Sequence, residues 1–400
     1  MSLSELWPQL ATLRANESNG SSMAWKVLYS RRRQPLLVPL DIAQARSAIA
    51  FFMRNPLLRY WGNLLLTLDH WMPRAQLLPT VRLEHFPYTA LFETSDFSGA
   101  ALFFGFPGPL QKLTMYCPDG NGGLGKVAKV ALHTSANHSI TQEAHWLRKL
   151  NQSKLIAGFL PSLLHQGALP CGRHYISMLA LPQGSSTEQF SKLHYQFLTV
   201  LAQQKTSIGR WQDSDAYARL HARTMKILPL IDEYHRKLLQ NALAEVDQMI
   251  GLTDLPTCMM HGDFAPWNVR LTKEQLFVFD WEYAETSANP LQDFLHFYLI
   301  PRALQRLPLR VSSMSETLPK VVAYAHAQFG KESGVAEASG ALIACYLLDV
   351  VTFYVDASGY LDPTHPVLRT YLRLLEQRTR WLPPTSRAPV TISPGLQHCG

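Results

Sequence analysis

The sequence has few cysteines, and their arrangement does not suggest a disulfide framework or a zinc site. Its 400 residues include five cysteines, which lie far apart and form no C-x-x-C pair. Scattered cysteines in an odd number are typical of a protein whose thiols stay reduced. Residues 1–14 also lack the basic start and apolar core of a signal peptide. We therefore expect a cytoplasmic protein.

Charged residues are scarce as well, at 17% of the chain, against a usual value of about 25%. The net charge is +7, yet the longest run of basic residues is Arg31–Arg33. Proteins that bind nucleic acids commonly carry a denser basic stripe. The sequence therefore predicts no nucleic-acid partner, whereas a mild positive excess is compatible with a polyphosphate ligand.

The chain also lacks a long apolar run without interruption. The most apolar region near its start, residues 48–68, is interrupted by Arg54, Asn55, Pro56 and Arg59. An ordinary transmembrane helix needs about 20 predominantly apolar residues. We therefore expect no integral membrane segment. We expect this region to form a buried amphipathic helix rather than a helix at a membrane surface.

Hydrophobic residues make up 47% of the chain, which is enough for sizeable cores. The length exceeds that of one ordinary core, so at least two lobes are expected. Residues 1–78 are expected to form a helical N-terminal extension, because Leu40–Met53 and Leu57–Trp71 have apolar residues at helical spacings. Pro56 separates these two segments. No chemistry is evident in this part.

Residues 79–182 are expected to form a β-rich lobe. The glycine-rich stretch Asp119–Gly125 is typical of a hairpin turn, because glycine accepts positive φ. A helix is expected over Ser139–Leu150, after the third strand. The expected strands are Ala101–Gly105, Lys112–Cys117, Lys126–Leu132 and His174–Leu179.

Residues 183–384 are expected to form a larger helical lobe, since apolar residues recur there at helical spacing over several long segments. A polar hairpin, residues 258–283, is inserted among these helices. The tail, residues 385–400, is rich in Pro, Ser and Gly and is expected to be disordered. The sequence thus predicts an α+β fold with a small β-rich N-lobe, a larger helical C-lobe and a helical extension.

The inserted hairpin carries the chemistry. It reads H-G-D-F-A-P-W-N over residues 261–268 and F-V-F-D-W-E over residues 277–282. This spacing places the carboxylates of Asp263 and Asp280 and the amide of Asn268 on the two sides of a short hairpin. Asp263 can orient an attacking hydroxyl and accept its proton, while Asn268 and Asp280 can hold Mg²⁺ against a nucleotide's phosphates. Phosphoryl transfer needs mainly positioning and charge neutralisation, so this set predicts a phosphotransferase.

The two motifs resemble the signature of the aminoglycoside phosphotransferase and choline kinase group. The resemblance covers roughly residues 95–380. It implies a two-lobed, protein-kinase-like fold. It also implies Mg²⁺-assisted transfer of the γ-phosphoryl group of ATP, or of GTP, to a hydroxyl of a small molecule.

The resemblance also assigns a role to each matching position. Asp263 matches the catalytic aspartate, and Asn268 and Asp280 match the two metal ligands. Lys129 matches the lysine that contacts the α- and β-phosphates, and Glu143 matches the helix glutamate that pairs with this lysine. The other nucleotide-binding positions are the loop glycines Gly105 and Gly108 and the connector residues Met178, Leu179 and Ala180, whose backbone is expected to meet adenine.

Strand alternation bears on the assignment of the lysine. Lys126 and Lys129 lie three residues apart, so their side chains point to opposite faces of the third expected strand. Lys129 is flanked by Ala128 and Val130, which favours it as the residue that faces the nucleotide. A solvated strand lysine is the alternative, and the role of Glu143 depends on that of Lys129.

The chain departs from the family pattern in two places. In the nucleotide loop, Pro107 and Pro109 offer no N–H to phosphate oxygens. Gly262 stands where protein kinases have an arginine, and only a short segment separates Asp280 from Asp293. The resemblance implies a structural role for Asp293. The second departure predicts a small-molecule acceptor rather than a protein. The first leaves open whether ATP or GTP is used.

Two other interpretations stay open. His261 and Asp263 are compatible with a hydrolytic metal site, with His296 available as a further ligand, although nothing ties His296 to the pair. The proline-containing loop suits a pseudokinase or a nucleotide-binding module that transfers no phosphate. The complete set of Asp263, Asn268 and Asp280 favours the kinase over both.

Overall fold

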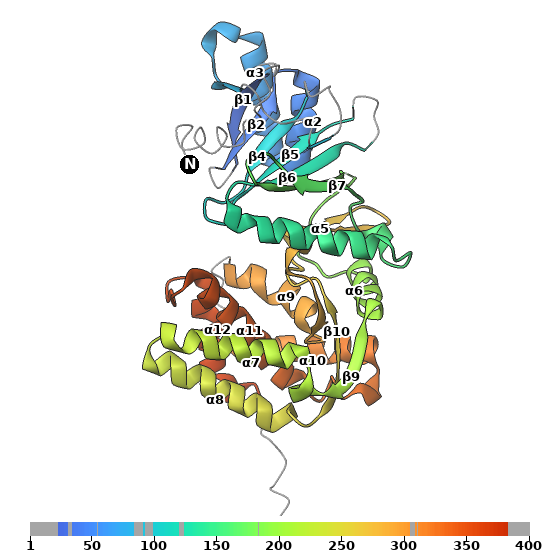
Figure 1. The fold of residues 1–400 in the computed structure, drawn as a ribbon, viewed down its shortest axis with the longest axis vertical. Coiled ribbons are helices and arrows are strands. Elements are labelled where there is room, and N and C mark those ends of the chain that lie inside the picture. The colour runs from blue at the N-terminus through green and yellow to red at the C-terminus, as the bar shows by residue number, and fades with distance from the viewer. Residues whose placement is uncertain are drawn as a thin grey trace, which may run out of the picture. The chain divides into compact units, whose positions relative to one another are not determined.

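The structure is a computed structural model that describes residues 23–30, 34–53, 55–83, 91–92, 99–119, 124–182, 184–304, 309 and 311–382. The chain divides into two compact units. Unit 1 comprises Met1–Val200 and His261–Ala284, and unit 2 comprises Leu201–Met260 and Glu285–Gly400. The catalytic-looking hairpin therefore belongs to the same unit as the N-terminal half of the chain (Figure 1).

Unit 1 is built on an eight-stranded antiparallel sheet with the strand order β3-β1-β2-β4-β5-β6-β8-β7. Strands β4, β5, β6 and β8 confirm the four predicted strands, whereas β3 and β7 were not predicted. The strands are β1 (Met23–Tyr29), β2 (Pro35–Pro39), β3 (Thr80–Leu83), β4 (Ala101–Phe104), β5 (Lys112–Cys117), β6 (Lys126–Ala131), β7 (Leu163–Ala168) and β8 (His174–Leu179).

The prediction that residues 1–78 form a helical extension is wrong for Met23–Tyr29 and Pro35–Pro39, which are strands. The described residues begin with β1 and β2, which join the same sheet as the strands after residue 79. These apolar runs are short: Trp25 and Val27 alternate onto a buried face, and the five residues of β2 are all buried. Runs of this length carry no helical period and suit a buried strand. The two predicted helices are confirmed as α2 (Ile42–Phe52) and α3 (Pro56–Trp71).

Two features of the sequence fix the pair of helices. The Asn55 side chain caps α3 by accepting the N–H groups of Leu57 and Leu58 at 2.9 and 3.3 Å. Pro56 follows as the first helical residue, where its missing N–H costs nothing. Gly62 lets α3 approach α2 closely, since a Cβ there would lie 3.3 Å from the Met53 sulfur.

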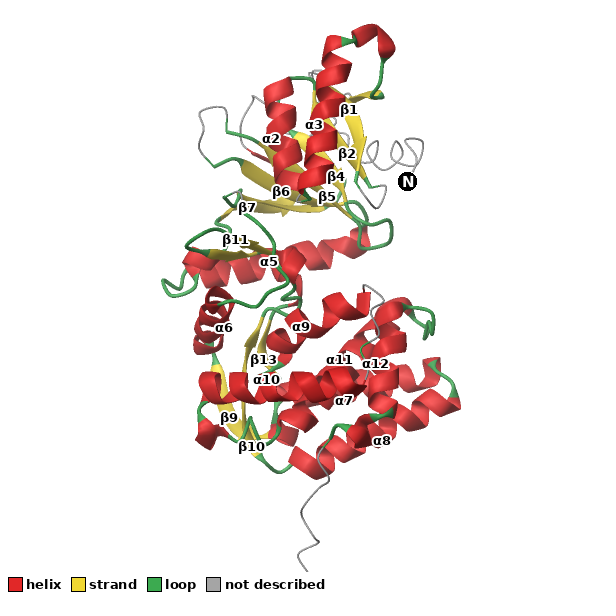
Figure 2. Ribbon diagram, turned by 180° about the vertical axis from the view of Figure 1, so that it is seen from behind, coloured by secondary structure: helices red, strands yellow, loops and turns green. Residues whose placement is uncertain are grey.

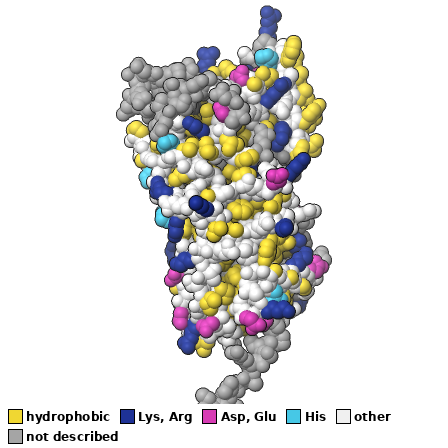
Figure 3. Space-filling view, turned by 90° about the vertical axis from the view of Figure 1, so that its right-hand side faces the viewer, with side chains coloured by type: hydrophobic (Ala, Val, Ile, Leu, Met, Phe, Trp, Pro, Cys, Tyr) yellow, Lys and Arg dark blue, Asp and Glu magenta, His cyan; other side chains and the backbone are white. Residues whose placement is uncertain are grey.

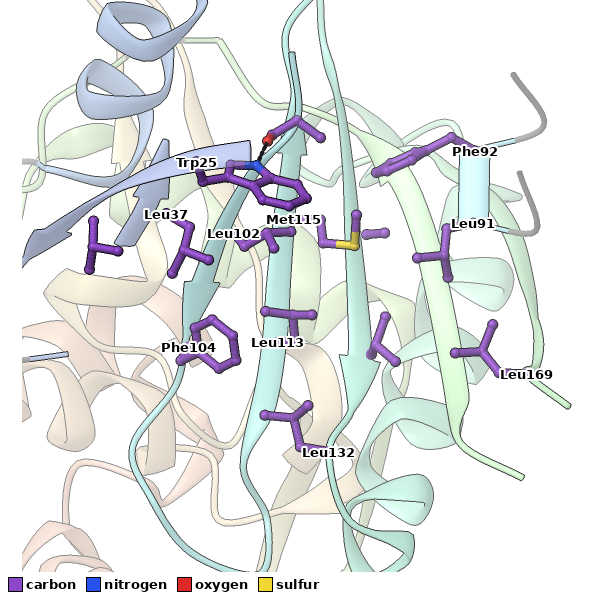
Figure 4. Close-up of a cluster of buried hydrophobic side chains, with 14 residues drawn as sticks. Trp25, Leu37, Leu91, Phe92, Leu102, Phe104, Leu113, Met115, Leu132 and Leu169 are labelled. Carbon is purple, nitrogen blue, oxygen red and sulfur yellow. Dashed lines mark hydrogen bonds between the residues drawn. The ribbon is translucent and has the colours of Figure 1, made fainter. Parts of the chain in front are cut away.

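One face of the sheet carries the core of unit 1 (Figure 4). Alternate residues of β1, β4, β5 and β6 point onto this face, and the Trp25 indole N–H donates to the Ala100 carbonyl at 2.7 Å. The largest members of the cluster are Trp25, Leu37, Phe92, Leu102, Phe104, Leu113 and Met115. Helix α2 packs on the other face, where Phe52 stacks on Phe103 at 5.3 Å between ring centroids.

Helix α5 (Asn137–Asn151) confirms the predicted helix and contacts β6, β7 and β8 (Figure 1). The inserted hairpin consists of β11 (Val269–Leu271) and β12 (Leu276–Val278). It is also tied to the connector that follows β8, because Ser185 and Leu271 exchange backbone hydrogen bonds at 3.0 and 2.8 Å. The middle of the predicted turn Asp119–Gly125 and the predicted tail lie outside the described residues.

Unit 2 is mainly helical (Figure 2). A three-stranded sheet, β13-β10-β9, accompanies the helices, and α6 (Lys192–Gln204) runs across the division between the units. The strands are β9 (Thr206–Arg210), β10 (Asp254–Met260) and β13 (Glu285–Ala288). The helices are α7 (Asp215–Ile227), α8 (Glu233–Ile250), α9 (Gln292–Leu304), α10 (Val311–Phe329), α11 (Ser339–Ser358) and α12 (Pro366–Glu376). The predicted α+β class, with a β-rich N-terminal part and a helical C-terminal part, is confirmed.

Helix α11 is the one helix, within the described part of the chain, that is long and apolar enough to cross a membrane. Its apolar window has a mean hydropathy of 1.6, and 72% of that window is buried inside the protein. Helices α7, α8 and α12 all contact it. These properties are those of the central helix of a folded core.

The sheet core of unit 1 should respond strongly to the loss of one aromatic side chain. Phe104 is fully buried, whereas Phe106, two residues later, is 56% exposed. We expect Phe104→Ala to lower the free energy of unfolding by about 3–5 kcal/mol, because it leaves a cavity. Phe106→Ala is the control and should stay within about 1 kcal/mol of the unaltered chain. Denaturant titration measures both, and equal effects would contradict this description of the core.

Candidate active site

Gly262 sets the direction of the chain as it enters the site. Its φ is +87°, and a Cβ at this position would lie 2.2 Å from the Tyr283 carbonyl oxygen. Both the backbone conformation and the close approach of Tyr283 therefore require glycine. The arginine that protein kinases carry at this position has no room here.

His261 has a structural place rather than a catalytic one. It is buried, its Nδ1 accepts the Asp263 N–H at 3.2 Å, and its Nε2 lies 3.1 Å from the Phe279 carbonyl oxygen. Since an N–H already donates to Nδ1, the ring hydrogen is on Nε2. The ring also packs edge-on against Trp281 at 4.6 Å between centroids. With both nitrogens bonded to backbone, His261 is not placed as a ligand of a hydrolytic metal site.

Asp263 and Asn268 are joined directly. The Asn268 amide nitrogen donates to the Asp263 carboxylate at 2.7 Å and to the Asp263 carbonyl at 3.0 Å. These bonds use the nitrogen of the amide, so its oxygen is the atom suited to a cation. They also fix one carboxylate oxygen of Asp263, which orients the other.

Backbone pairing brings Asp280 next to Asn268. The Phe279 N–H donates to the Asn268 carbonyl at 3.1 Å, one residue before Asp280. Asp280 itself has a left-handed backbone with φ 67° and ψ 62°. Such a conformation costs an ordinary residue roughly 1–2 kcal/mol, and it is tolerated best by Asn and Asp. It precedes the short helix η7 (Trp281–Tyr283), whose Trp281 indole donates to the Val278 carbonyl at 3.0 Å.

Lys129 is buried between two carboxylates. Its ammonium lies 2.6 and 2.9 Å from the two Glu143 oxygens and also forms an ion pair with Asp280. Burial lowers the pKa of Lys129, but the Asp280 and Glu143 carboxylates outweigh it and raise this pKa above its ordinary value. Lys129 thus stays charged throughout the physiological range.

The two carboxylates respond in opposite directions. Burial alone raises the pKa of the Asp280 carboxyl, but the positive charges of Lys129 and Lys112 hold it well below its usual range. Burial raises the pKa of Glu143, and the charge of Lys129 offsets part of this effect.

Lys112 and Glu282 form a further ion pair beside this cluster, and the sequence analysis did not identify either residue. Lys112 lies on β5, two residues before Thr114, which stands directly opposite Lys129. Strand alternation therefore puts Lys112 and Lys129 on the same face of the sheet. The alternation of Lys112 can be read from the sequence, but its ion pair with the distant Glu282 cannot.

The predicted nucleotide loop, residues 105–111, is closed by its own hydrogen bonds. The Gly105 N–H donates to the Lys112 carbonyl at 2.9 Å, and the Gln111 N–H donates to the Gly108 carbonyl at 3.0 Å. Pro107 and Pro109 have no N–H to offer. Gly108 has a φ of +151° and no heavy atom within 4 Å of a Cβ placed on it. The loop therefore presents few backbone donors in this conformation.

The predicted connector continues β8, where Met178 stands opposite Val127 and Leu179 opposite Lys126 on β6. The Leu179 N–H donates to the Ser162 carbonyl at 2.9 Å, and the Ala180 N–H to the Gly125 carbonyl at 2.7 Å. Both N–H groups are thus used inside unit 1. Met178, Leu179 and Ala180 lie at the end of the strand next to the one that carries Lys129, and their contact with adenine stays a prediction.

Two other residues of interest lie in unit 2. Asp293 is buried in the first turn of α9, as expected for a structural residue. Cys258 is buried in β10, and burial raises the pKa of its thiol to about 12. Such a thiol is inert as a nucleophile at neutral pH. The free cysteines of the described residues are Cys117, Cys171, Cys258 and Cys345.

Comparison with protein families agrees with this geometry. Residues 119–312 match the model of the phosphotransferase enzyme family. The predicted resemblance is confirmed. The match also confirms the predicted class of enzyme, a phosphotransferase. Among curated proteins, no sequence matches this chain.

Solved structures similar to this chain are aminoglycoside phosphotransferases. A thermostable mutant of the aminoglycoside phosphotransferase APH(4)-Ia in its apo form is 14% identical, with a TM-score of 0.48 over 73% of this chain and 97% of that one. The GDP complex of an aminoglycoside 2'-phosphotransferase-IIIa mutant is 14% identical, with a TM-score of 0.48 over 73% of this chain and 96% of that one. The streptomycin–ATP complex of APH(2'')-IIa is 15% identical, with a TM-score of 0.45 over 74% of this chain and 96% of that one.

The glycine that opens the site offers a test of its geometry. We expect Gly262→Ala to destabilise the protein by more than about 2 kcal/mol, because the new Cβ meets a backbone oxygen and the positive φ is strained. Gly209→Ala is the matched control: a Cβ there meets nothing within 4 Å, and Gly209 has no positive φ. Thermal unfolding of both variants measures the difference. A Gly262→Ala protein as stable as the control would contradict this backbone arrangement.

Proposed function

We propose that this chain transfers the γ-phosphoryl group of ATP, or of GTP, to a hydroxyl of a small molecule. The observation that carries the proposal is that unit 1 contains both a buried lysine held by two carboxylates and an aspartate oriented by an asparagine. Lys129 is held between Glu143 and Asp280, and Asp263 is bonded to Asn268 at 2.7 Å. Phosphoryl transfer needs these elements: a cation for the phosphates, oxygen ligands for a metal ion, and a carboxylate for the acceptor.

In this proposal Asp263 is the catalytic residue. Its carboxylate accepts a hydrogen bond from the acceptor hydroxyl, orients it and takes its proton as the new bond to phosphorus forms. The bond from Asn268 keeps the carboxylate in one orientation, so that little reorganisation is needed when the acceptor binds. The peptide N–H of Asp263 is anchored on the buried His261, which fixes the backbone as well.

Asn268 and Asp280 would hold Mg²⁺. Their oxygen donors match the ligands that this hard cation prefers. The hydrogen bond from the Phe279 N–H to the Asn268 carbonyl, one residue before Asp280, supports a shared site. When bound, the ion would neutralise the charge of the phosphates. Lys129 would contact the phosphates as well, with Glu143 keeping its ammonium in place. Residues 79–182 would thus supply most nucleotide contacts, and residues 183–384 the catalytic hairpin.

Gly262 and the short segment after Asp280 support a small-molecule acceptor. An arginine at position 262, as in protein kinases, would anchor a phosphorylated activation loop, but Gly262 has no space for any side chain. Some of the similar solved structures contain streptomycin or hygromycin B. We propose an acceptor of the same general kind for this chain.

A second candidate function is a module that binds nucleotide without transferring phosphate. The observation that favours it is the loop of residues 105–111, in which prolines and internal hydrogen bonds leave few donors for phosphate oxygens. The same loop would allow transfer if nucleotide binding rearranged it around Gly108. Turnover decides between the two candidates.

The deciding experiment incubates the purified chain with Mg²⁺ and ATP, or Mg²⁺ and GTP, together with pools of amino alcohols, sugars and aminoglycosides. Mass spectrometry then searches for acceptors that gain one phosphate group. Gain in at least one pool supports the kinase. Nucleotide binding without gain in any pool supports the second candidate.

The role of Asp263 gives a sharp prediction for any acceptor found in that screen. We expect Asp263→Asn to lower kcat by at least about 100-fold, because the amide cannot take the hydroxyl proton. Nucleotide affinity should change by less than about threefold, since Asp263 is not among the proposed phosphate or metal ligands. The new amide oxygen can still accept the Asn268 bond, so the fold is kept. A variant that retains its rate would refute the role of Asp263.

Asp280→Ala serves as the counterpart. It should leave nucleotide binding nearly independent of Mg²⁺, whereas the unaltered chain and Asp263→Asn should both bind more tightly when Mg²⁺ is present. Calorimetry with and without the metal ion makes this comparison. Equal Mg²⁺ dependence in all three proteins would remove Asp280 from the proposed metal site.

A further inference from the structure

Phe51 lies in an unusual stack near the candidate site. Its ring is nearly parallel to that of Tyr116, with 4.1 Å between centroids and 6° between planes. The Arg270 guanidinium carbon lies over the Phe51 ring at 4.2 Å from its centroid. One face of a ring cannot hold both groups at these distances, so Tyr116 and Arg270 cover opposite faces of Phe51.

The two covering residues belong to the strands that carry the proposed nucleotide site. Tyr116 stands opposite Val127 on β6, and Val127 stands opposite the connector residue Met178. Val127 is two residues from Lys129, so both point to the same face of the sheet and lie about 7 Å apart along the strand.

On the other side of the stack, Arg270 lies on β11, two residues after Asn268. The stack therefore adjoins both the expected adenine connector and the groups expected to hold the phosphates.

We propose that Tyr116 and Arg270 form the two walls of the slot for the nucleotide base, and that Phe51 fills this slot when no nucleotide is bound. This inference rests on the proposed function. A purine is flat and stacks on a tyrosine ring and on a guanidinium in the same way as a phenyl ring does. The nucleotide and Phe51 therefore compete for one space, and base binding requires Phe51 to leave.

Release of Phe51 needs the end of α2 to open and the Arg270 guanidinium to give up its hydrogen bond to the Phe51 carbonyl at 3.3 Å. Phe51 is the residue before the last one of the helix, and Met53 already has an extended backbone. The last turn is held by Arg59, whose guanidinium donates to the carbonyls of Met53 and Ala50 at 3.3 and 3.5 Å. Helix ends open at a small fraction of the free energy of global unfolding. The C-terminal end of α2 thereby closes the base slot reversibly.

The test compares two neighbouring phenylalanines in the full-length chain. Phe52 is the matched control, since it also packs on this face of the sheet, against Phe103. Binding of a non-hydrolysable ATP analogue with Mg²⁺ is measured by calorimetry. We expect Phe51→Ala to bind about tenfold more tightly than the unaltered chain, because it removes the competitor of the base. Phe52→Ala should bind within about threefold of the unaltered chain.

The other outcomes are also decisive. Unchanged or weaker binding by Phe51→Ala, with the unaltered chain binding normally, overturns the slot and leaves the proposed function intact. A gain shared equally by both variants overturns it as well, since it would reflect general loosening of α2. No binding by any of the three proteins removes the proposed function and the slot together.

A separate observation concerns the outer face of α3. Its residues Leu57, Tyr60, Trp61, Leu65, Leu68, Trp71 and Met72 are all exposed, with Trp71 at 77% and Leu57 at 71%. At 3.6 residues per turn they fall on one continuous face about 140° wide. Gly62, Leu66 and Asp69 lie on the face that is buried against the protein. The helix is therefore apolar toward solvent as well as toward the core, which corrects the expectation of a simple buried helix for residues 48–68.

Basic residues lie beside this exposed face. Arg46 donates to Thr67 of α3 at 3.1 Å, and His70 and Arg74 lie at the C-terminal end of the helix. Among the described residues of the range 34–83 the acidic ones are Asp41 and Asp69. Asp41 caps α2, and Asp69 is buried in an ion pair with Lys26. Figure 3 shows hydrophobic and basic side chains next to each other at the upper end of the molecule.

We infer that α3 docks on the surface of an anionic lipid bilayer, with its exposed apolar face in the headgroup region. Tryptophan and tyrosine prefer this region, and basic residues beside an apolar helical face are attracted by anionic lipids. A protein partner would also cover the apolar face, but it would not explain why so few acidic residues are exposed around that face. The membrane accounts for both the apolar face and its charge.

The test uses flotation of the full-length chain with vesicles of phosphatidylcholine, with or without phosphatidylglycerol. We expect the unaltered chain to float with the anionic vesicles only, and high salt to weaken this binding. The double variant Trp61→Ser, Trp71→Ser should bind at least about tenfold less. The control, Leu252→Ser with Tyr360→Ser, removes two similarly exposed apolar residues of unit 2 and should bind as the unaltered chain does.

Three outcomes overturn the membrane proposal. They are an unaltered chain that stays out of the anionic vesicles, a double variant that floats equally well, and self-association of the unaltered chain that the double variant abolishes. The last result would make a second copy of the chain the occupant of this face.

Discussion

The buried ammonium group of Lys129 joins three segments, one of which lies far from the other two in the sequence. It belongs to β6, pairs with Glu143 of α5, and pairs with Asp280 at a sequence separation of 151 residues. An isolated charge is very costly to bury, so both carboxylates depend on the lysine. Removing the lysine would leave two carboxylates repelling each other. This constraint ties α5 and the hairpin of residues 258–283 to β6.

The same cluster explains why the remaining site residues are where they are. Once Asp280 is held by Lys129, the pairing of Phe279 with Asn268 fixes Asn268, and the Asn268 amide fixes Asp263. Gly262 then has to turn under Tyr283, which only a residue without a side chain can do. Each link uses a different kind of interaction: an ion pair, a strand ladder, a side-chain hydrogen bond and a steric limit.

The sequence predicted the residues of this chain of contacts because most of them lie in one local pattern. Asp263, Asn268 and Asp280 come from a single hairpin, and strand alternation, the apolar neighbours of Lys129 and the family resemblance favoured Lys129 over Lys126. By contrast, the Lys112–Glu282 pair and the stack of Phe51 on Tyr116 and Arg270 join residues from distant segments. No local period encodes such pairings, which depend on strand order.

The same limit explains the missed strands β1, β2, β3 and β7. Their runs are too short for a clear period, and only their neighbours in the sheet define them as strands.

The order of the strands makes β1 and β2 part of the same sheet as the strands that follow residue 79. β2 covers the edge of β4, β1 covers β2, and β3 returns to cover β1. A protein trimmed to begin at residue 79 would therefore present the bare backbone edge of β4 to solvent, and β3 would have no neighbour at all. Open edges of this kind recruit strands from other molecules. We therefore expect expression of a chain trimmed in this way to yield aggregates rather than a minimal kinase.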